Sequence, residues 1–211
     1  MLIGQTIAIG IVSGGIFTKY LEDLGVHTPM LQLAFIYTGL AFSLIYFYKQ
    51  RETKQFTKVP LWKYFLCSVV DVHATLCIVL AFTKTSLTSV MIIQDFTIPS
   101  AVLLSLFFLK IRYMRTHFIA ISICLLGIGI GFCNDFFIIG RDQSPGSSPV
   151  LGDCLELISA FLYALENVLC EHLVRTDLDV YQYIGWLGVF GMLITYSYAF
   201  IFNEYAQLSN S

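Results

Sequence analysis

Acidic side chains interrupt three long apolar stretches of this chain, near positions 71, 95 and 156. An ionisable group in the middle of a bilayer costs at least about 2.5–3.5 kcal/mol, so it usually faces a water-filled cavity or a polar partner. Carboxylates, amides and hydroxyls in such places can bind a polar solute or hold neighbouring helices together. The polar residues within each stretch therefore carry the functional argument.

The first of these stretches contains Ser68, Asp71 and Thr75, which follow i, i+3 and i+7 spacing and share one face of a helix. His73 lies off that face. One interpretation places Asp71 and Thr75 on a water-filled path through the protein. The alternative is a buried acid that bonds to a neighbouring helix.

The second stretch places Thr88, Asp95 and Pro99 on one stripe, with Gln94 beside it. Because Pro99 has no backbone N–H, it leaves a carbonyl free near Asp95 and predicts a kink. Broken helices near the bilayer midplane are a feature of transporter sites. The alternative is a simple packing kink in which Asp95 caps a neighbouring helix.

The third stretch is the most polar, and one face of it carries Glu156, Tyr163, Asn167 and Glu171. Asp153 and Glu166 flank this face. Asp153 and Glu171 lie near the ends, where water can solvate them. The deeper residues predict a stripe that faces a lumen.

No catalytic set or metal site emerges from the remaining polar residues. The four histidines are scattered, and the six cysteines form no C-x-x-C pair. Asp71 and Asp95 lie on different stretches, as an aspartyl dyad would require, but no flanking motif supports one. We expect no enzymatic activity, no metal and no cofactor.

The elements that position these residues are membrane-spanning helices. Of the 211 residues, 57% are hydrophobic and 12% are charged, whereas soluble domains have about 25% charged residues. The net charge of −2 argues against nucleic acid as a partner, and the lipid bilayer is the expected surrounding. Seven stretches approach the roughly 20 residues that a helix needs to span a bilayer: Leu2–Lys19, Met30–Tyr48, Leu61–Phe82, Leu87–Leu109, His117–Cys133, Val150–His172 and Tyr181–Phe202. The fold class is therefore all-α, a polytopic transmembrane helix bundle.

The connecting segments predict orientation and organisation. Nine Lys and Arg residues lie in or beside the loops on one side and three on the other, so the N-terminus is expected to be cytoplasmic. The sequence does not distinguish the plasma membrane from an endomembrane, and it does not give the oligomeric state. The polar segment 134–149 separates residues 1–133, with five spans, from residues 150–211, with two. Gly-x-x-x-Gly spacings at Gly10 and Gly127 permit close helix contact, for which packing within the chain is preferred over dimerisation.

Short motifs along nearly the whole chain resemble the F subfamily of solute carrier family 35, nucleotide-sugar-transporter-like members of the drug/metabolite transporter superfamily. The matching residues occur in the family's order: Thr18-Lys19-Tyr20-Leu21, Trp62-Lys63-Tyr64, Asp71, Leu87-Thr88-Ser89-Val90, Phe96, Ile98-Pro99, Ile111-Arg112-Tyr113, His117-Phe118-Ile119, Gly152-Asp153, Tyr163, Asn167-Val168 and Glu171. This resemblance implies ten helices in two inverted five-helix repeats with a substrate path between them. It also implies that residues 1–133 form one repeat and residues 150–211 begin the second.

The chain departs from the family pattern at three points. Gln94 stands where the family has an acid, and Asp95 carries the charge one position later, about 100° around the helix. His73 replaces a family Glu. The last three helices are absent, which bears on transport itself.

The leading hypothesis is a carrier that moves a small polar organic solute by alternating access. Its path is predicted to be lined by Asp71, Thr75, Gln94, Asp95, Glu156, Tyr163 and Asn167, with Pro99 at a helix kink. The alternative is a truncated, non-transporting membrane protein or scaffold.

Overall fold

All regular structure in the described part of the chain is helical. The computed structural model describes residues 5, 13, 14, 16–18, 20, 28–49, 59–109, 114–134, 148–175 and 180–202. Most of the predicted span Leu2–Lys19 and nearly all of the predicted loop 134–149 lie outside the described residues.

The remaining six predicted spans agree with helices of the structure to within two residues at each end. In chain order the helices are α2 (Pro29–Lys49), α3 (Leu61–Lys84), α4 (Leu87–Gln94), α5 (Thr97–Phe108), α6 (Arg115–Asn134), α7 (Pro149–Val174) and α8 (Val180–Ile201). The predicted all-α class is confirmed.

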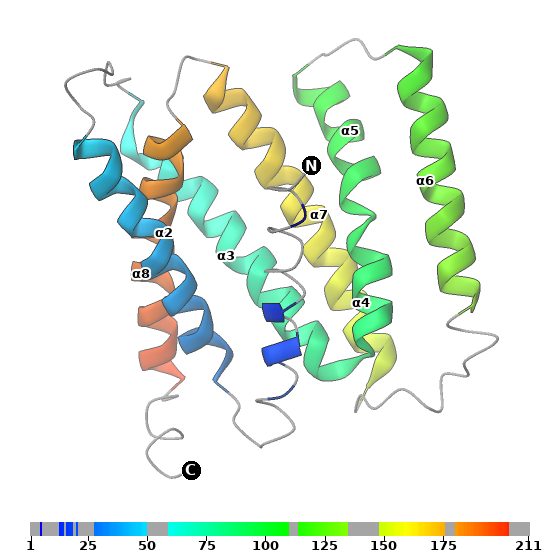
Figure 1. Cartoon of the computed structure of the whole chain (residues 1–211), viewed down its shortest axis with the longest axis horizontal. Coiled ribbons are helices and arrows are strands. Elements are labelled where there is room, and N and C mark those ends of the chain that lie inside the picture. The colour runs from blue at the N-terminus through cyan, green and yellow to red at the C-terminus, as the bar shows by residue number, and fades with distance from the viewer. Residues whose placement is uncertain are drawn as a thin grey trace.

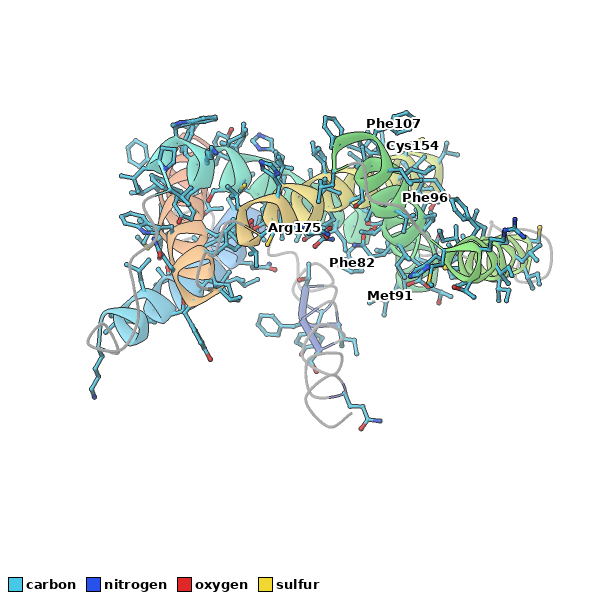
Figure 2. The ribbon with its side chains drawn as sticks, turned by 90° about the horizontal axis from the view of Figure 1, so that it is seen from above. Phe82, Met91, Phe96, Phe107, Cys154 and Arg175 are labelled. Atoms are coloured by element: carbon cyan, nitrogen blue, oxygen red, sulfur yellow. The ribbon has the colours of Figure 1, made fainter. Side chains whose placement is uncertain are left out.

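The lengths and surfaces of these helices suit a bilayer. Four helical stretches are long and apolar enough to cross a membrane, and α2 and α6 contribute shorter apolar segments. Large apolar side chains are exposed on the outside of the bundle, among them Phe107 (78%) and Phe200 (79%). Figure 2 shows Phe107 on the outer edge of the helix array. Such a surface is stable when lipid covers it, so the chain is a multi-pass membrane protein.

The helices form an elongated array in which successive spans alternate in direction (Figure 1). The helix pair α2 and α8 lies at one end, and α6 lies at the other (Figure 2). Between them α7 packs against α3 on one side and against α4 and α5 on the other. The polar residues of α3 and α7 therefore meet in the middle of the array.

The fourth span is divided into two helices, α4 and α5 (Figure 1). The break lies at Asp95 and Phe96, directly before the first turn of α5, which contains Pro99. An unbroken helix would direct the N–H of residue 99 to the Asp95 carbonyl, and Pro99 has no such donor. The N–H of Ile98 donates to that carbonyl instead, at 3.2 Å. The freed carbonyl is thus satisfied by a tighter local turn.

Three glycines of α8 allow α2 to approach closely. A Cβ atom at Gly188 would collide with the backbone of α2 at Ala41, and one at Gly191 would collide with the ring of Tyr37. Gly185 meets the side chain of Leu44 in the same way. The expectation for Gly127 is wrong, because nothing lies within 4 Å of a Cβ built there. The glycines that allow close packing in the described bundle are therefore those of α8 and Gly152 of α7, where a Cβ atom would collide with Thr85.

Candidate polar site between α2, α3 and α7

Four side chains from three helices form a hydrogen-bonded cluster inside the bundle. The hydroxyl of Tyr37 on α2 donates to Asp71 Oδ2 on α3 at 2.8 Å and lies 3.2 Å from Thr75 Oγ1. Thr75 Oγ1 is 2.9 Å from the hydroxyl of Tyr163 on α7. We call Tyr37, Asp71, Thr75 and Tyr163 the central cluster. It joins residues that are 34 to 88 positions apart in the chain.

Because each hydroxyl group has a single hydrogen, the donors and acceptors in the central cluster can be assigned. Thr75 donates its single hydroxyl hydrogen to the Asp71 carbonyl at 2.8 Å, and Tyr37 donates to the Asp71 carboxylate. Tyr163 must then donate to Thr75. The hydroxyls of both tyrosines therefore point toward the α3 turn that carries Asp71. The hydrogen bond of Tyr37 ends on the Asp71 carboxylate, and the chain from Tyr163 through Thr75 ends on the Asp71 backbone carbonyl.

The packing of α8 positions Tyr37 in this cluster. Tyr37 is 2% exposed, and its ring lies directly against Gly191 of α8. On the other side, Ser159 of α7 donates to the Ala74 carbonyl of α3 at 2.8 Å, which fixes α7 on α3 one turn before Tyr163. Helix packing on both sides of α3 thus holds the two tyrosine hydroxyls at Thr75.

Glu156 lies two turns before Tyr163 on α7 and differs from the central cluster. It is 0% exposed, and neither carboxylate oxygen has a hydrogen-bond partner in the described part of the chain. Buried polar groups usually have such partners, so this carboxyl group needs a physical explanation.

The other predicted path residues do not join the cluster. Gln94 is partly buried with its amide oxygen unpartnered, and Asp95 is exposed at the α4–α5 break. Asn167 is exposed on α7, whereas Pro99 is buried in α5. The structure therefore brings together Asp71, Thr75 and Tyr163 and places the rest separately.

Sequence reasoning missed Tyr37 and gave Glu166 only a flanking place. Glu166 is 9% exposed and accepts a hydrogen bond from Tyr183 of α8 at 2.6 Å. A tyrosine in the middle of an apolar span, away from the interfacial belts where this residue usually sits, is the signal that could have indicated Tyr37.

The two ends of α7 have different environments. Asp153 was expected to be solvated by water near the end of its helix, but its carboxylate accepts hydrogen bonds from Thr85 at 2.9 Å and Ser89 at 2.8 Å. Asp153 thereby fixes the start of α7 to the turn between α3 and α4. At the other end, the 40% exposed Glu171 pairs with Arg175 at 2.7 Å.

Comparisons with known proteins agree with this architecture. A family profile described as SLC35F, solute carrier family 35, matches residues 1–210. The mouse solute carrier family 35 member F2 is 36% identical over 198 residues, which cover 92% of this chain and 52% of the relative. The corresponding Xenopus tropicalis protein is 35% identical, with coverage of 90% and 50%.

A more distant relative is an uncharacterised solute carrier family 35 member of Schizosaccharomyces pombe. It is 27% identical over 209 residues, which cover 96% of this chain and 40% of the relative. The chain thus spans about half the length, or less, of the curated relatives it matches. The profile match over nearly all residues places the chain in the F subfamily of solute carrier family 35.

Proposed function

We propose that this chain contributes the solute path of a membrane carrier for a small polar organic molecule, working by alternating access. The observation that carries the proposal is the central cluster, which puts one carboxylate and three hydroxyl groups among apolar spans. Polar groups in spanning helices are costly and commonly mark a solute or ion path. Membership of a solute carrier family supports the same function.

The proposed path follows the contact between α3 and α7. Asp71, Thr75 and Tyr163 supply one carboxylate and two hydroxyls, which suit the hydroxyl and amide groups of a polar organic solute. The other proposed lining residues are Gln94, Asp95, Glu156 and Asn167. The unpartnered amide oxygen of Gln94 is a further group that a solute donor could satisfy.

The α4–α5 break offers a mechanical basis for alternating access. Asp95 and Phe96 interrupt the fourth span, and both halves pack against α7. A short irregular segment between two rigid half-helices can absorb the dihedral changes of a rocking motion. We propose that movement of α5 relative to α4 opens and closes the path beside α7.

The test is uptake by purified protein in sealed vesicles. The vesicles are placed in a desalted small-molecule extract of cells, and the solutes that accumulate inside are compared with those in empty vesicles by mass spectrometry. We expect at least one solute to accumulate. A hydrogen bond to a charged group is worth about 1.5–3 kcal/mol, so Asp71→Asn should slow uptake of that solute by about tenfold or more.

The matched control is Glu171→Gln, another acid-to-amide change on the surface at the end of α7. It should leave uptake unchanged. The carrier proposal is wrong if no solute accumulates, or if Asp71→Asn behaves like Glu171→Gln.

A further inference from the structure

Three carboxyl groups lie inside the bundle without a basic partner among the residues that the structure describes. Asp71 and Glu166 each accept a hydrogen bond from a tyrosine, and Glu156 accepts none. The Lys and Arg residues that the structure describes all lie at or beside helix ends: Lys49, Lys63, Lys84, Arg115 and Arg175. Within the described residues, the interior of the bundle therefore carries acidic groups that no Lys or Arg neutralises.

Glu156 is the member of this group with the fewest compensating contacts. Seven residues separate it from the start of α7, which puts it about 10 Å along the helix axis. Its side chain is fully buried, and both oxygens lack a hydrogen-bond donor. An ionised carboxylate is tolerated in such a place only when it is paired, whereas a neutral carboxylic acid costs far less. The conformation described here therefore suits the protonated form.

Among the described residues, no titratable side chain forms a hydrogen bond or an ion pair with Glu156. On α3, Cys77 interacts electrostatically with Glu156, whereas the ring nitrogens of His73 contact the Val69 carbonyl and the Tyr198 hydroxyl. Helices α4 and α5 contain no titratable residue, and Asp95 between them is acidic and exposed. Tyr163 and Asp153 are the neighbours on α7 itself, and neither brings a cation.

Other occupants fit this position less well than a proton. A metal ion needs several ligands, and the described residues contain no group of three or more His, Cys, Asp or Glu side chains that could hold one. An organic cation needs space beside the carboxylate. The apolar groove of about 600 Å³ on α7 is lined by residues other than Glu156: Ser148, Val150, Leu151, Cys154, Leu155 and Ile158.

We propose that Glu156 is the proton-binding site of the carrier and that the proton is its coupling ion. In the described conformation the carboxyl group keeps its O–H bond. When the solute path opens and water reaches Glu156, this bond breaks, the proton passes to water and the carboxylate remains. The use of the proton in transport rests on the proposed carrier function, whereas the protonated state of Glu156 does not.

Infrared spectroscopy of the purified 211-residue chain tests the protonated state without any solute. The carbonyl stretch of a neutral carboxylic acid is separate from the bands of a carboxylate. Spectra are recorded at neutral pH, and the spectrum of each variant is subtracted from that of the wild type. We expect the difference spectrum for Glu156→Gln to show a carboxylic-acid band that the difference spectrum for Glu171→Gln lacks. Thermal unfolding checks that both variants fold. Absence of this band in folded protein would overturn the proposal.

Uptake under a pH gradient tests the coupling. The probe is the cell extract. Uptake is measured under three conditions: equal pH on both sides of the membrane, a pH one unit higher inside the vesicles, and a pH one unit higher outside. One unit is equivalent to about 1.4 kcal/mol, so one proton per solute allows about tenfold further accumulation in one orientation. In Glu156→Gln the ratio of solute accumulation between the two orientations of the gradient should fall to one.

The outcomes separate the two proposals. If no solute accumulates under any condition but the infrared band is present, the carrier function fails and the proton site stands. If solute accumulates without any effect of the gradient, or if Glu156→Gln keeps the tenfold response, the carrier stands and proton coupling is wrong.

Discussion

The hydroxyl of Tyr37 contacts both polar groups of α3 in the central cluster, the carboxylate of Asp71 and the hydroxyl of Thr75. It thereby connects α2 to the contact between α3 and α7. Because Tyr37 is almost completely buried, water cannot replace the hydroxyl easily if it is removed.

Tyr37→Phe removes this hydroxyl and keeps the ring that packs against Gly191. Hydrogen bonds between membrane helices contribute about 0.6 kcal/mol on average and up to about 1.7 kcal/mol. We expect Tyr37→Phe to lower the free energy of unfolding, measured by titration with a denaturing detergent, by an amount within this range. Tyr196→Phe on α8 is the control, since no hydrogen bond of its hydroxyl occurs among the described residues. Equal losses for the two variants would mean that the Tyr37 hydroxyl stabilises nothing.

Helical periodicity predicts part of this site from sequence. Asp71 and Thr75 are four residues apart on one helix, so their common face follows from 3.6 residues per turn. The contact of Tyr37 with Asp71 depends instead on how far α2 is shifted along α3, and no local pattern encodes that shift. Asn167 also shows that helical spacing alone does not predict which residues join the site. It follows Tyr163 by one turn, yet it is exposed while Tyr163 joins the cluster.

At the scale of elements, the contact between α2 and α8 depends on small residues. Gly185, Gly188 and Gly191 recur every three residues and face α2 over two turns. Without a hydrophobic driving force in lipid, close van der Waals contact is a main source of helix association. The positions of the spans follow from hydropathy, but which glycines lie at a contact depends on the partner helix. Gly127 has the familiar spacing and faces open space.

Gly188→Ala should weaken this helix pair. The added methyl group meets the backbone of α2, which cannot rotate aside as a side chain can. Such overpacking costs about 1–3 kcal/mol. Thermal unfolding can be followed by the reaction of a thiol dye with buried cysteines such as Cys67. Gly127→Ala, with free space around it, should unfold at the wild-type temperature or above, and the packing argument is wrong if the two variants lose equal stability.

At the scale of the whole molecule, the alternating helices put the connecting segments at two opposite ends of the array (Figure 1). The end of α2, the start of α3, the end of α5, the start of α6 and the end of α7 lie at one end of the array. The end of α6 and the start of α7 lie at the opposite end. In the sequence, nine of the twelve Lys and Arg residues lie in or beside the segments that connect helices at the first end, so the positive-inside rule predicts that this end faces the cytoplasm.

Single cysteines at positions 54 and 147 test this orientation in a variant whose six native cysteines are replaced. Lys54→Cys should react with a membrane-impermeant maleimide once digitonin opens the plasma membrane. Ser147→Cys should react on intact cells if the protein is at the cell surface, or after complete solubilisation if it is in an organelle. The alternating helices require opposite behaviour at the two positions, because α3, α4–α5 and α6 lie between them and make three crossings. Labelling of both cysteines from the same side would contradict this number of crossings. Labelling of Ser147→Cys alone from the cytoplasm would agree with the fold but show that the orientation is opposite to the expected one.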